Sequence, residues 1–315
     1  RELPIHVHAD NMKPATRVRP FFDNINVNAY IKPDDKFTVT STNRTDFNFA
    51  PLQDPGSQAD SDSGRFFGTY SDPDSDIAYP AAAFAIGDVV RNNVHTATSV
   101  TNAVKSGNTV TITAASVSGI AVGHIVTFDS IGGAVELNTG KYRVESVNTG
   151  ANTFTIVNSD ATGTAISTMT SYTSGGTVTR QQASGVVTFQ GPDNPDATDG
   201  LPIVIHIANI KNGFALSDQL TGAVDNASGV KNLCTISAVN GVTDATSTDV
   251  YKNLKKFGDT LLTDAEGTFT GVFVVPDTEE LKFRTGDRVL RLIDNTTNVV
   301  DIGVHTTKAE RIFRA

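Results

Sequence analysis

The sequence predicts an all-β protein with many turns. Charged residues make up 19% of the 315 residues, below the usual quarter, and there are 26 glycines among many Thr, Ser, Asn and Asp residues. Short stretches of alternating apolar and polar residues recur along the chain, each bounded by Gly, Asn, Asp or Pro. These observations indicate strands joined by tight turns and argue against a helical enzyme.

Residues 1–95 are expected to supply a few strands and then a long polar loop. Residues 41–79 lack regular alternation and are punctuated by Pro and Gly, which predicts a surface excursion. Loops of this length are usually functional or partly disordered. The strands predicted before it are 3–8, 17–22, 25–31 and 37–40.

Residues 96–184 are expected to form a compact all-β module. The segment TVTIT at 109–113 alternates cleanly, and Gly and Asn residues separate the following strands at hairpin spacing. No window here has a helical period. The predicted strands are 108–113, 122–128, 141–147, 153–157 and 177–180.

Residues 185–315 return to strand patterns with one helix. The helix is predicted over 247–257, with Ser247 or Thr248 as its cap and Gly258 at its end. Its apolar stripe would consist of Val250, Leu254 and Phe257. The strands predicted in this region are 185–189, 202–210, 235–239, 271–275, 281–284, 288–293 and 299–302.

One turn pattern recurs along the chain. It reads AIGDVV at 85–90, AVGHIV at 121–126 and RTGDRV at 284–289, with a weaker copy, LSDQL, at 216–220. Each is a turn with a left-handed position, leading into a strand. Two interpretations stay open: an internal repeat, or several small modules that use the same turn. Because glycine turns are common, the second is favoured.

The middle module resembles a small β-module that recurs in virion proteins of tailed bacteriophages. The resemblance rests on GIAVGHIVTF at 119–128, GGAVELN at 132–138, YRV at 142–144 and NTFTI at 152–156. That module is often likened to the first catalytic cysteine half-domain (FCCH) of ubiquitin-activating enzymes. Here His124 replaces the usual Asp, and Thr139 with Gly140 replaces a Gly. The module contains no cysteine, so the likeness implies no ubiquitin chemistry.

The two chain ends resemble segments of large structural proteins of marine tailed phages. The matching segments are MKPATRVRPFFDNINV at 12–27, LTDAEGTFTGVFVVP at 262–276 and FRTGDRVLRLID at 283–294, in the family's order. Asn24 stands where the family often has Gly, and Arg19 where it often has Tyr. In those proteins the segments belong to one Ig-like β-sandwich of a tail, baseplate or fibre component. The resemblance therefore implies an Ig-like β-sandwich built from both chain ends, with an inserted small β-barrel-like module.

The distribution of predicted strands along the chain is compatible with this architecture. Residues 1–40 and 260–315 each contain too few strands to close a core alone, but together they can form one sandwich. Gly267 and Gly271 would permit a tight turn and a close backbone approach, and Asp264 could accept hydrogen bonds from turn amides. The residues expected in the core are Phe21, Val27, Phe273, Val275, Phe283, Leu290 and Leu292.

Composition limits the possible partners. The formal net charge is −9, so the chain lacks the basic face that nucleic acids or anionic lipid surfaces require. The longest apolar stretch, 201–210, is too short to cross a bilayer. No Trp is present, which leaves few platforms for stacking on sugars or bases. Cys234 is the single cysteine, expected to be a buried apolar residue.

Candidate sites are few. His6 and His8 share one face of a predicted strand and are weak candidates for a metal site, especially around a symmetry axis. Since no third ligand is in view, ordinary strand residues are the favoured interpretation. The acidic residues of the long loop lack the spacing of a known calcium loop, so a solvated loop is favoured there too. They are Asp60, Asp62, Asp72, Asp74 and Asp76.

No pattern of a nucleophilic elbow, phosphate loop or dinucleotide site is present, so we expect no catalytic residues and no cofactor. The resemblances imply a non-enzymatic structural protein located in the virion. Its expected partners are other virion proteins and further copies of itself on a symmetric particle. The alternative is an adhesin module that binds a host-surface glycan. Because the chain begins at Arg1 within a strand pattern, we expect a segment of a longer polypeptide or a processed product.

Overall fold

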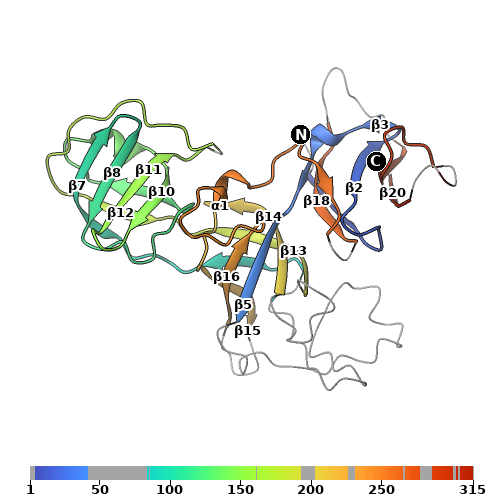
Figure 1. The fold of residues 1–315 in the computed structure, drawn as a ribbon, viewed down its shortest axis with the longest axis horizontal. Coiled ribbons are helices and arrows are strands. Elements are labelled where there is room, and N and C mark those ends of the chain that lie inside the picture. The colour runs from blue at the N-terminus through green and yellow to red at the C-terminus, as the bar shows by residue number, and fades with distance from the viewer. Residues whose placement is uncertain are drawn as a thin grey trace. The chain divides into compact units, whose positions relative to one another are not determined.

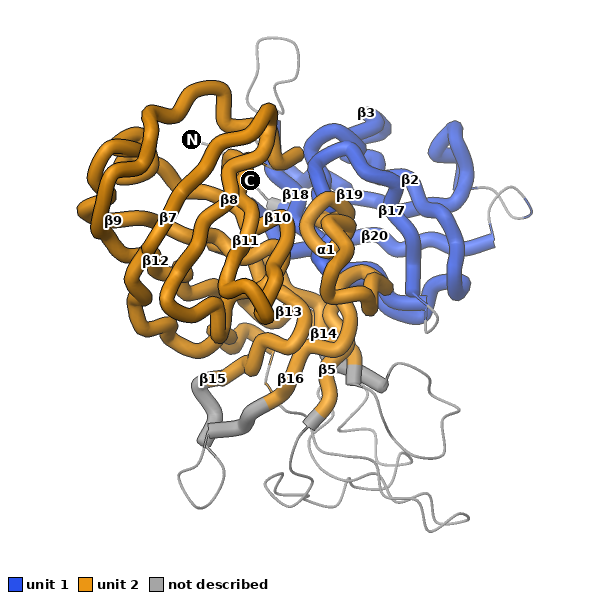
Figure 2. Tube along the Cα trace, turned by 60° about the vertical axis from the view of Figure 1, so that its left-hand side comes forward, with its two compact units in different colours: residues 1–35, 194–197, 255–315 blue, residues 36–193, 198–254 orange. Residues whose placement is uncertain are grey.

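The structure is a computed structural model that describes residues 4–41, 84, 86–160, 162–192, 203–225, 231–264, 267–276, 286–300, 303 and 306–314. The predicted all-β class is confirmed: the described part of the chain holds twenty strands, one α-helix and two 3-10 helices (Figure 1). The chain divides into two compact units. Unit 1 is built from residues 1–35, 194–197 and 255–315, and unit 2 from residues 36–193 and 198–254 (Figure 2).

Unit 1 contains two sheets, each with strands from both ends of the chain. In the first sheet, β18 (Phe269–Val274) lies between β1 (Pro4–Ala9) and β4 (Ile31–Pro33). The second sheet has the order β17-β2-β19-β20, and a short β3 pairs with β2. Its strands are β17 (Leu261–Leu262), β2 (Arg17–Phe22), β19 (Asp287–Ile293), β20 (Lys308–Arg314) and β3 (Ile25–Asn26). A 3-10 helix, η1 (Asn28–Tyr30), precedes β4.

The two sheets share one hydrophobic core. Phe22 of β2 and Phe273 of β18 are in contact there, with ring centroids 5.2 Å apart. The predicted core residues that are buried are Phe21, Val27, Phe273, Leu290 and Leu292. Val275 is half-buried and packs against this core, and Phe283 lies outside the described residues.

The middle module is a closed six-stranded barrel, here called the first barrel. Its strand order is β10-β11-β8-β7-β12-β9. The alternation of the sequence places Val110, Ile112 and Ala114 inside, with the threonines between them half-exposed. The strands are β7 (Thr98–Ser106), β8 (Thr109–Ala114), β9 (Ile125–Asp129), β10 (Tyr142–Asn148), β11 (Thr153–Asn158) and β12 (Thr177–Arg180), and η2 (Val135–Thr139) follows β9.

A second closed barrel, with the order β13-β14-β5-β16-β15-β6, has its own core. Residues 35–41 and 185–239 were expected to belong to the sandwich, but their strands pair with one another in this separate barrel. Alternation identifies the buried face of a strand but not its partner, and these partners are distant in sequence. The strands are β5 (Asp35–Ser41), β6 (Val89–Asn92), β13 (Ser184–Pro192), β14 (Ile203–Lys211), β15 (Gln219–Asp225) and β16 (Lys231–Val239).

The predicted helix over 247–257 is shorter in the structure. It is α1 (Asp249–Lys252), which buries Val250 and Tyr251. Phe257, expected on its apolar stripe, is 51% exposed. A single turn lacks the length that makes an isolated helix stable, so burial of two side chains holds it. In the described residues, no helix is long and apolar enough to cross a membrane.

Candidate functional site

Two turns of unit 2 have the same local structure. One spans residues 119–124 (GIAVGH) before β9, and the other spans residues 213–218 (GFALSD) before β15. Both contain two left-handed positions, the first and the fifth, with φ values of 74° and 96° in one turn and 63° and 67° in the other. In both, the last side chain accepts a hydrogen bond from the backbone N–H three residues earlier. Ala121 N donates to His124 Nδ1 at 2.9 Å, and Ala215 N donates to Asp218 Oδ2 at 3.0 Å.

The last residues of these two turns are bonded to each other. His124 Nε2 lies 2.9 Å and 3.0 Å from the two carboxylate oxygens of Asp218. Both side chains are almost fully buried, with 2% and 4% exposed. Because Nδ1 of His124 accepts the amide hydrogen of Ala121, the proton on the ring is assigned to Nε2, which donates to Asp218. The pair joins the first barrel to the second.

Two further donors surround the same carboxylate. Arg180 Nη1 lies 3.2 Å from Asp218 Oδ1, and Asn92 Nδ2 donates to Oδ2 at 2.9 Å. Burial alone would raise the pKa of Asp218, but the neighbouring His124 and the hydrogen bonds outweigh it, so the pKa lies below its usual range. Arg180 also donates to the carbonyl oxygens of Gly119 and Asn93. Its Nε is buried and has no hydrogen-bond partner.

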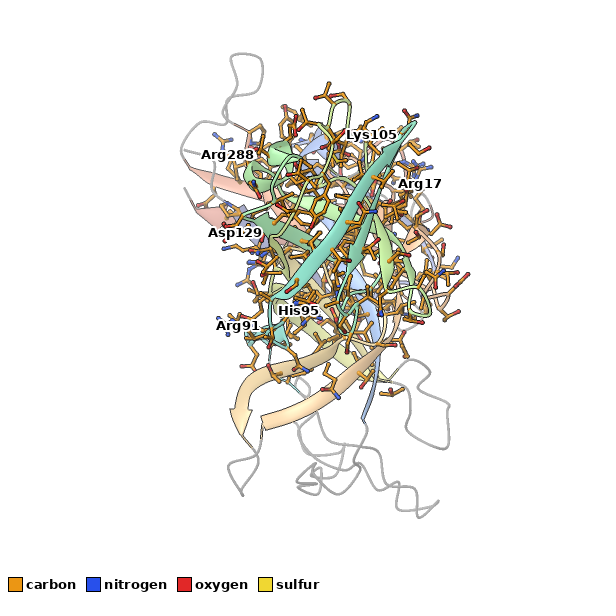
Figure 3. The ribbon with its side chains drawn as sticks, turned by 90° about the vertical axis from the view of Figure 1, so that its left-hand side faces the viewer. Arg17, Arg91, His95, Lys105, Asp129 and Arg288 are labelled. Carbon is orange, nitrogen blue, oxygen red and sulfur yellow. The ribbon has the colours of Figure 1, made fainter. Side chains whose placement is uncertain are left out.

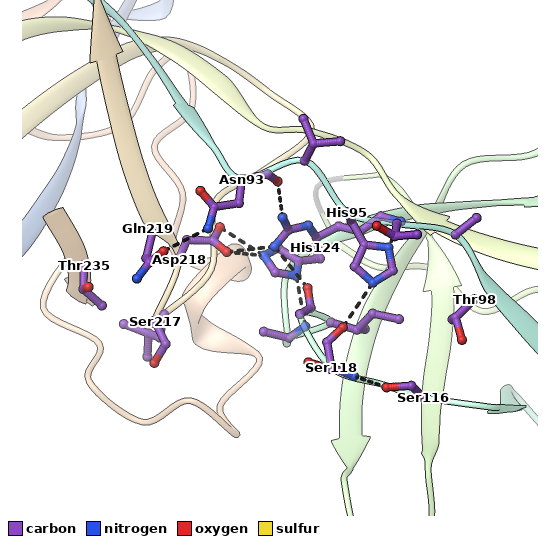
Figure 4. Close-up of a pocket in the computed structure, with 18 residues that line it drawn as sticks. Asn93, His95, Thr98, Ser116, Ser118, His124, Ser217, Asp218, Gln219 and Thr235 are labelled. Atoms are coloured by element: carbon purple, nitrogen blue, oxygen red, sulfur yellow. Dashed lines mark hydrogen bonds and ion pairs between the residues drawn. The ribbon is translucent and has the colours of Figure 1, made fainter. Parts of the chain in front are cut away.

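A cavity of about 810 Å³ opens beside this cluster. His95, His124, Arg180 and Asp218 line it, and its other polar side chains carry hydroxyls and amides (Figure 4). They come from Asn93, Thr96, Thr98, Ser116, Ser118, Ser217, Gln219 and Thr235. Arg180 and Asp218 compensate each other, so the cavity carries no unbalanced fixed charge from Lys, Arg, Asp or Glu.

His95 stands at the edge of this cavity, just before β7, and Figure 3 places it at the opposite end of that strand from Lys105. Its Nε2 is 3.1 Å from the carbonyl oxygen of Ser118, and its Nδ1 is 3.3 Å from the backbone N of Arg180. Both ring nitrogens are therefore occupied, and the ring is the neutral tautomer with its proton on Nε2. Burial lowers the pKa of His95.

The imidazole and carboxylate groups at the cavity are bonded within the protein. The ring nitrogens of His95 and His124 are all hydrogen-bonded, and Asp218 accepts four donors. Cys234 lies in the core of the second barrel, where burial raises the pKa of its thiol to about 12.

The histidines predicted as weak metal candidates lie on β1. His6 and His8 are both exposed on one face of the strand, and His8 Nε2 is 2.5 Å from Asp10 Oδ1. Within the described residues, no group of three His, Cys, Asp or Glu side chains could hold a metal ion. The acidic cluster from Asp60 to Asp76 lies outside the described residues.

Sequence reasoning did not select the residues of this cluster as a site. The recurring turn pattern did contain both His124 and Asp218, since it aligned 121–126 with 216–220. A shared sequence pattern does not predict that two copies are in contact. Arg180 and Asn92 belong to no motif that the sequence shows.

No protein-family model matches the chain, and no curated protein matches it.

Proposed function

We propose that this protein is a non-enzymatic structural component of a tailed-phage virion, in a tail, baseplate, fibre or neck. The observation that carries the proposal is that the phage-like segments 12–27 and 262–276 are hydrogen-bonded to each other. Met12 N donates to Gly267 O at 3.0 Å, and Ala15 N donates to Asp264 O at 2.9 Å. The segments that resemble one phage domain thus meet in one core, which supports an Ig-like sandwich for unit 1.

Assembly would use the free edges of the sheets in unit 1. Within the described residues, β1, β4 and β20 each pair with one strand only, so each has an edge able to accept an added strand. Ile312 on β20 is 61% exposed, so this edge strand presents an apolar side chain to solvent. Copies of this chain, or other virion proteins, would pair along such an edge.

The oligomeric state tests this function. Light scattering after size exclusion should give a discrete trimer or hexamer for the purified chain, and Ile312→Lys should shift it towards monomer. Val104→Lys is the matched control, because Val104 is 51% exposed but lies in a closed barrel that has no edge. A clean monomer at high concentration, unchanged by Ile312→Lys, would count against edge-mediated assembly.

The cavity favours a second candidate function, binding of a neutral host-surface glycan. Its hydroxyl and amide groups match sugar hydroxyls, and Val94, Ile120 and Leu216 offer apolar contact. The volume lies within the range of known ligand sites. Because its fixed charges cancel, an uncharged polyhydroxylated ligand fits better than an anion.

Calorimetric titration with neutral trisaccharides, maltotriose and chitotriose, tests this alternative. Binding should be lost in Ser118→Arg, whose side chain would occupy the cavity. Ser106→Arg, at the far end of β7, makes the same change away from the cavity and should bind normally. Absence of heat with both sugars, or equal binding by Ser118→Arg, would contradict a glycan site here.

A further inference from the structure

The two barrels of unit 2 have the same closed strand order. Each strand of the second barrel can be matched to one strand of the first barrel so that all neighbours in the two closed sheets agree. With β13 matched to β7, the strands of both barrels also follow in the same cyclic chain order. The correspondence pairs β13 with β7, β14 with β8, β15 with β9, β16 with β10, β5 with β11, and β6 with β12. The second barrel therefore has the topology of the first with its chain ends moved to another loop.

Hydrogen bonds agree with this correspondence residue by residue. In the first barrel, residues 123–124 exchange two backbone hydrogen bonds of 2.9 Å with Val144 on β10. In the second, residues 217–218 exchange two bonds of the same length with Ile236 on β16. The strand pairing shifts register directly after Val144 and directly after Ile236. Such irregularities are defined features of a sheet, so a shift at the same place in both barrels is a specific likeness.

The cores also correspond. Phe154 on β11 lies opposite Val147, and Phe37 on β5 lies opposite Val239, at equivalent positions. These phenylalanines are 1% and 0% exposed. Each is followed by a threonine and a buried aliphatic residue, in FTI at 154–156 and FTV at 37–39.

We infer that the second barrel is a circularly permuted copy of the first, and that the face around the turn before β9 is a docking surface for a barrel of the same kind. The two copies meet at equivalent positions, His124 and Asp218, as the subunits of a twofold dimer do near their axis. The other copies of the turn pattern carry acids there, Asp88 and Asp287.

His124 is the residue that makes this pairing attractive. An aspartate at 124 would face the carboxylate of Asp218 at hydrogen-bond distance in a buried site, and two like charges there would repel. Histidine keeps the acceptor that the amide of Ala121 needs and adds a donor towards Asp218. The departure from the usual Asp thus gives one barrel a complementary partner in the other.

Exchanging the two residues in the full chain tests this inference. His124→Asp and Asp218→His should each lower the melting temperature of unit 2 by about 10 °C, because each breaks a buried pair. The double variant His124→Asp/Asp218→His should recover part of that loss, because it restores an imidazole–carboxylate bond between the turns, although Arg180 and Asn92 lose the carboxylate they donate to. His6→Asp, on an exposed strand of unit 1, is the matched control and should change little. A double variant as damaged as the two single variants combined would overturn the pairing.

A milder variant keeps the test decisive if the exchanged chains fail to fold. Asp218→Asn preserves shape, and hydrogen exchange should become roughly tenfold faster at the Ala215 amide and also at the Ala121 amide in the other barrel. The Gly87 amide, bonded to Val187 O at 2.8 Å in a third copy of the turn pattern, should keep its rate. Faster exchange at Ala215 alone would overturn the inference.

Discussion

The Asp218 carboxylate shows how a buried charge is tolerated in this fold. A charged group taken from water costs several kcal/mol unless its hydrogen bonds are replaced. Asp218 accepts from a backbone amide, an imidazole, a guanidinium and a side-chain amide, from both barrels and the segments beside them. Each donor is itself fixed in a turn or at a strand end, so the hydrogen bonds to the carboxylate need little further ordering of side chains. This makes Asp218 a structural centre of unit 2.

Asp218 should make the stability of unit 2 depend on pH in acid. Its folded pKa lies below the ordinary value of 3.8, so the unfolded chain binds more protons there. The stabilisation is complete above the unfolded pKa and is lost as pH falls through the folded one. Urea unfolding at pH 7, 5 and 3 should show a fall for the native chain and a smaller fall for Asp218→Asn. Equal falls in both chains would assign the acid sensitivity to other carboxylates.

At the scale of elements, two glycines allow close approaches between segments of unit 1. The first is Gly267, which lies against the backbone of Met12. Gly267 has a φ of 80°, and a methyl group there would overlap the carbonyl oxygen of Met12. Gly271 is a second close approach, since a Cβ there would lie 2.7 Å from Lys32 O. The sequence predicted a tight turn and a close backbone approach at these two glycines, and also the turn role of Asp264, which accepts the amide of Thr268 at 2.7 Å.

Gly267→Ala should therefore destabilise unit 1 more than the same change at Gly258. Both glycines are left-handed, but at Gly258 the nearest atom to a new Cβ would be Ala29 Cα at 3.9 Å. Gly258→Ala should cost about 1 kcal/mol for backbone strain alone. Gly267→Ala should add about 1–3 kcal/mol because Met12 must move. Denaturant titration of the two variants measures the difference, and equal losses would contradict the crowding.

The elements that the sequence predicts well are those set by local pattern. Strands over 17–22, 108–113 and 153–157 agree with the structure to within a residue or two, because alternation and turn residues act within one strand. The helix predicted over 247–257 was longer than the observed one, because Phe257 matches the apolar period of a helix but is exposed in the structure. The second barrel was missed because its strands come from three distant parts of the chain, residues 35–41, 89–92 and 184–239. The His124–Asp218 pair was missed for the same reason, as pairing is a tertiary property.

At the scale of the molecule, the described chain has three separate hydrophobic cores. One belongs to unit 1 and one to each barrel of unit 2. The first stretch of unit 1 ends at Asp35 and its last stretch begins at Lys255, and Lys255 N donates to Asp35 Oδ1 at 2.7 Å. Asp35 is 1% exposed, so this bond ties the two ends of unit 1 where the insertion begins and ends. We therefore expect the core of unit 1 to be stable independently of the inserted residues.

Separate cores predict separate effects of core variants. Phe273 in unit 1 and Phe154 in the first barrel are both aromatic and at most 1% exposed. Replacing either by Ala should cost about 3–5 kcal/mol, from lost burial and the remaining cavity. Calorimetry of the full chain should show Phe273→Ala lowering one transition and Phe154→Ala lowering another, because each core stabilises its own unit. If both variants lower every transition equally, the units unfold as one cooperative body, and the division of the chain at residues 35 and 255 is not a thermodynamic one.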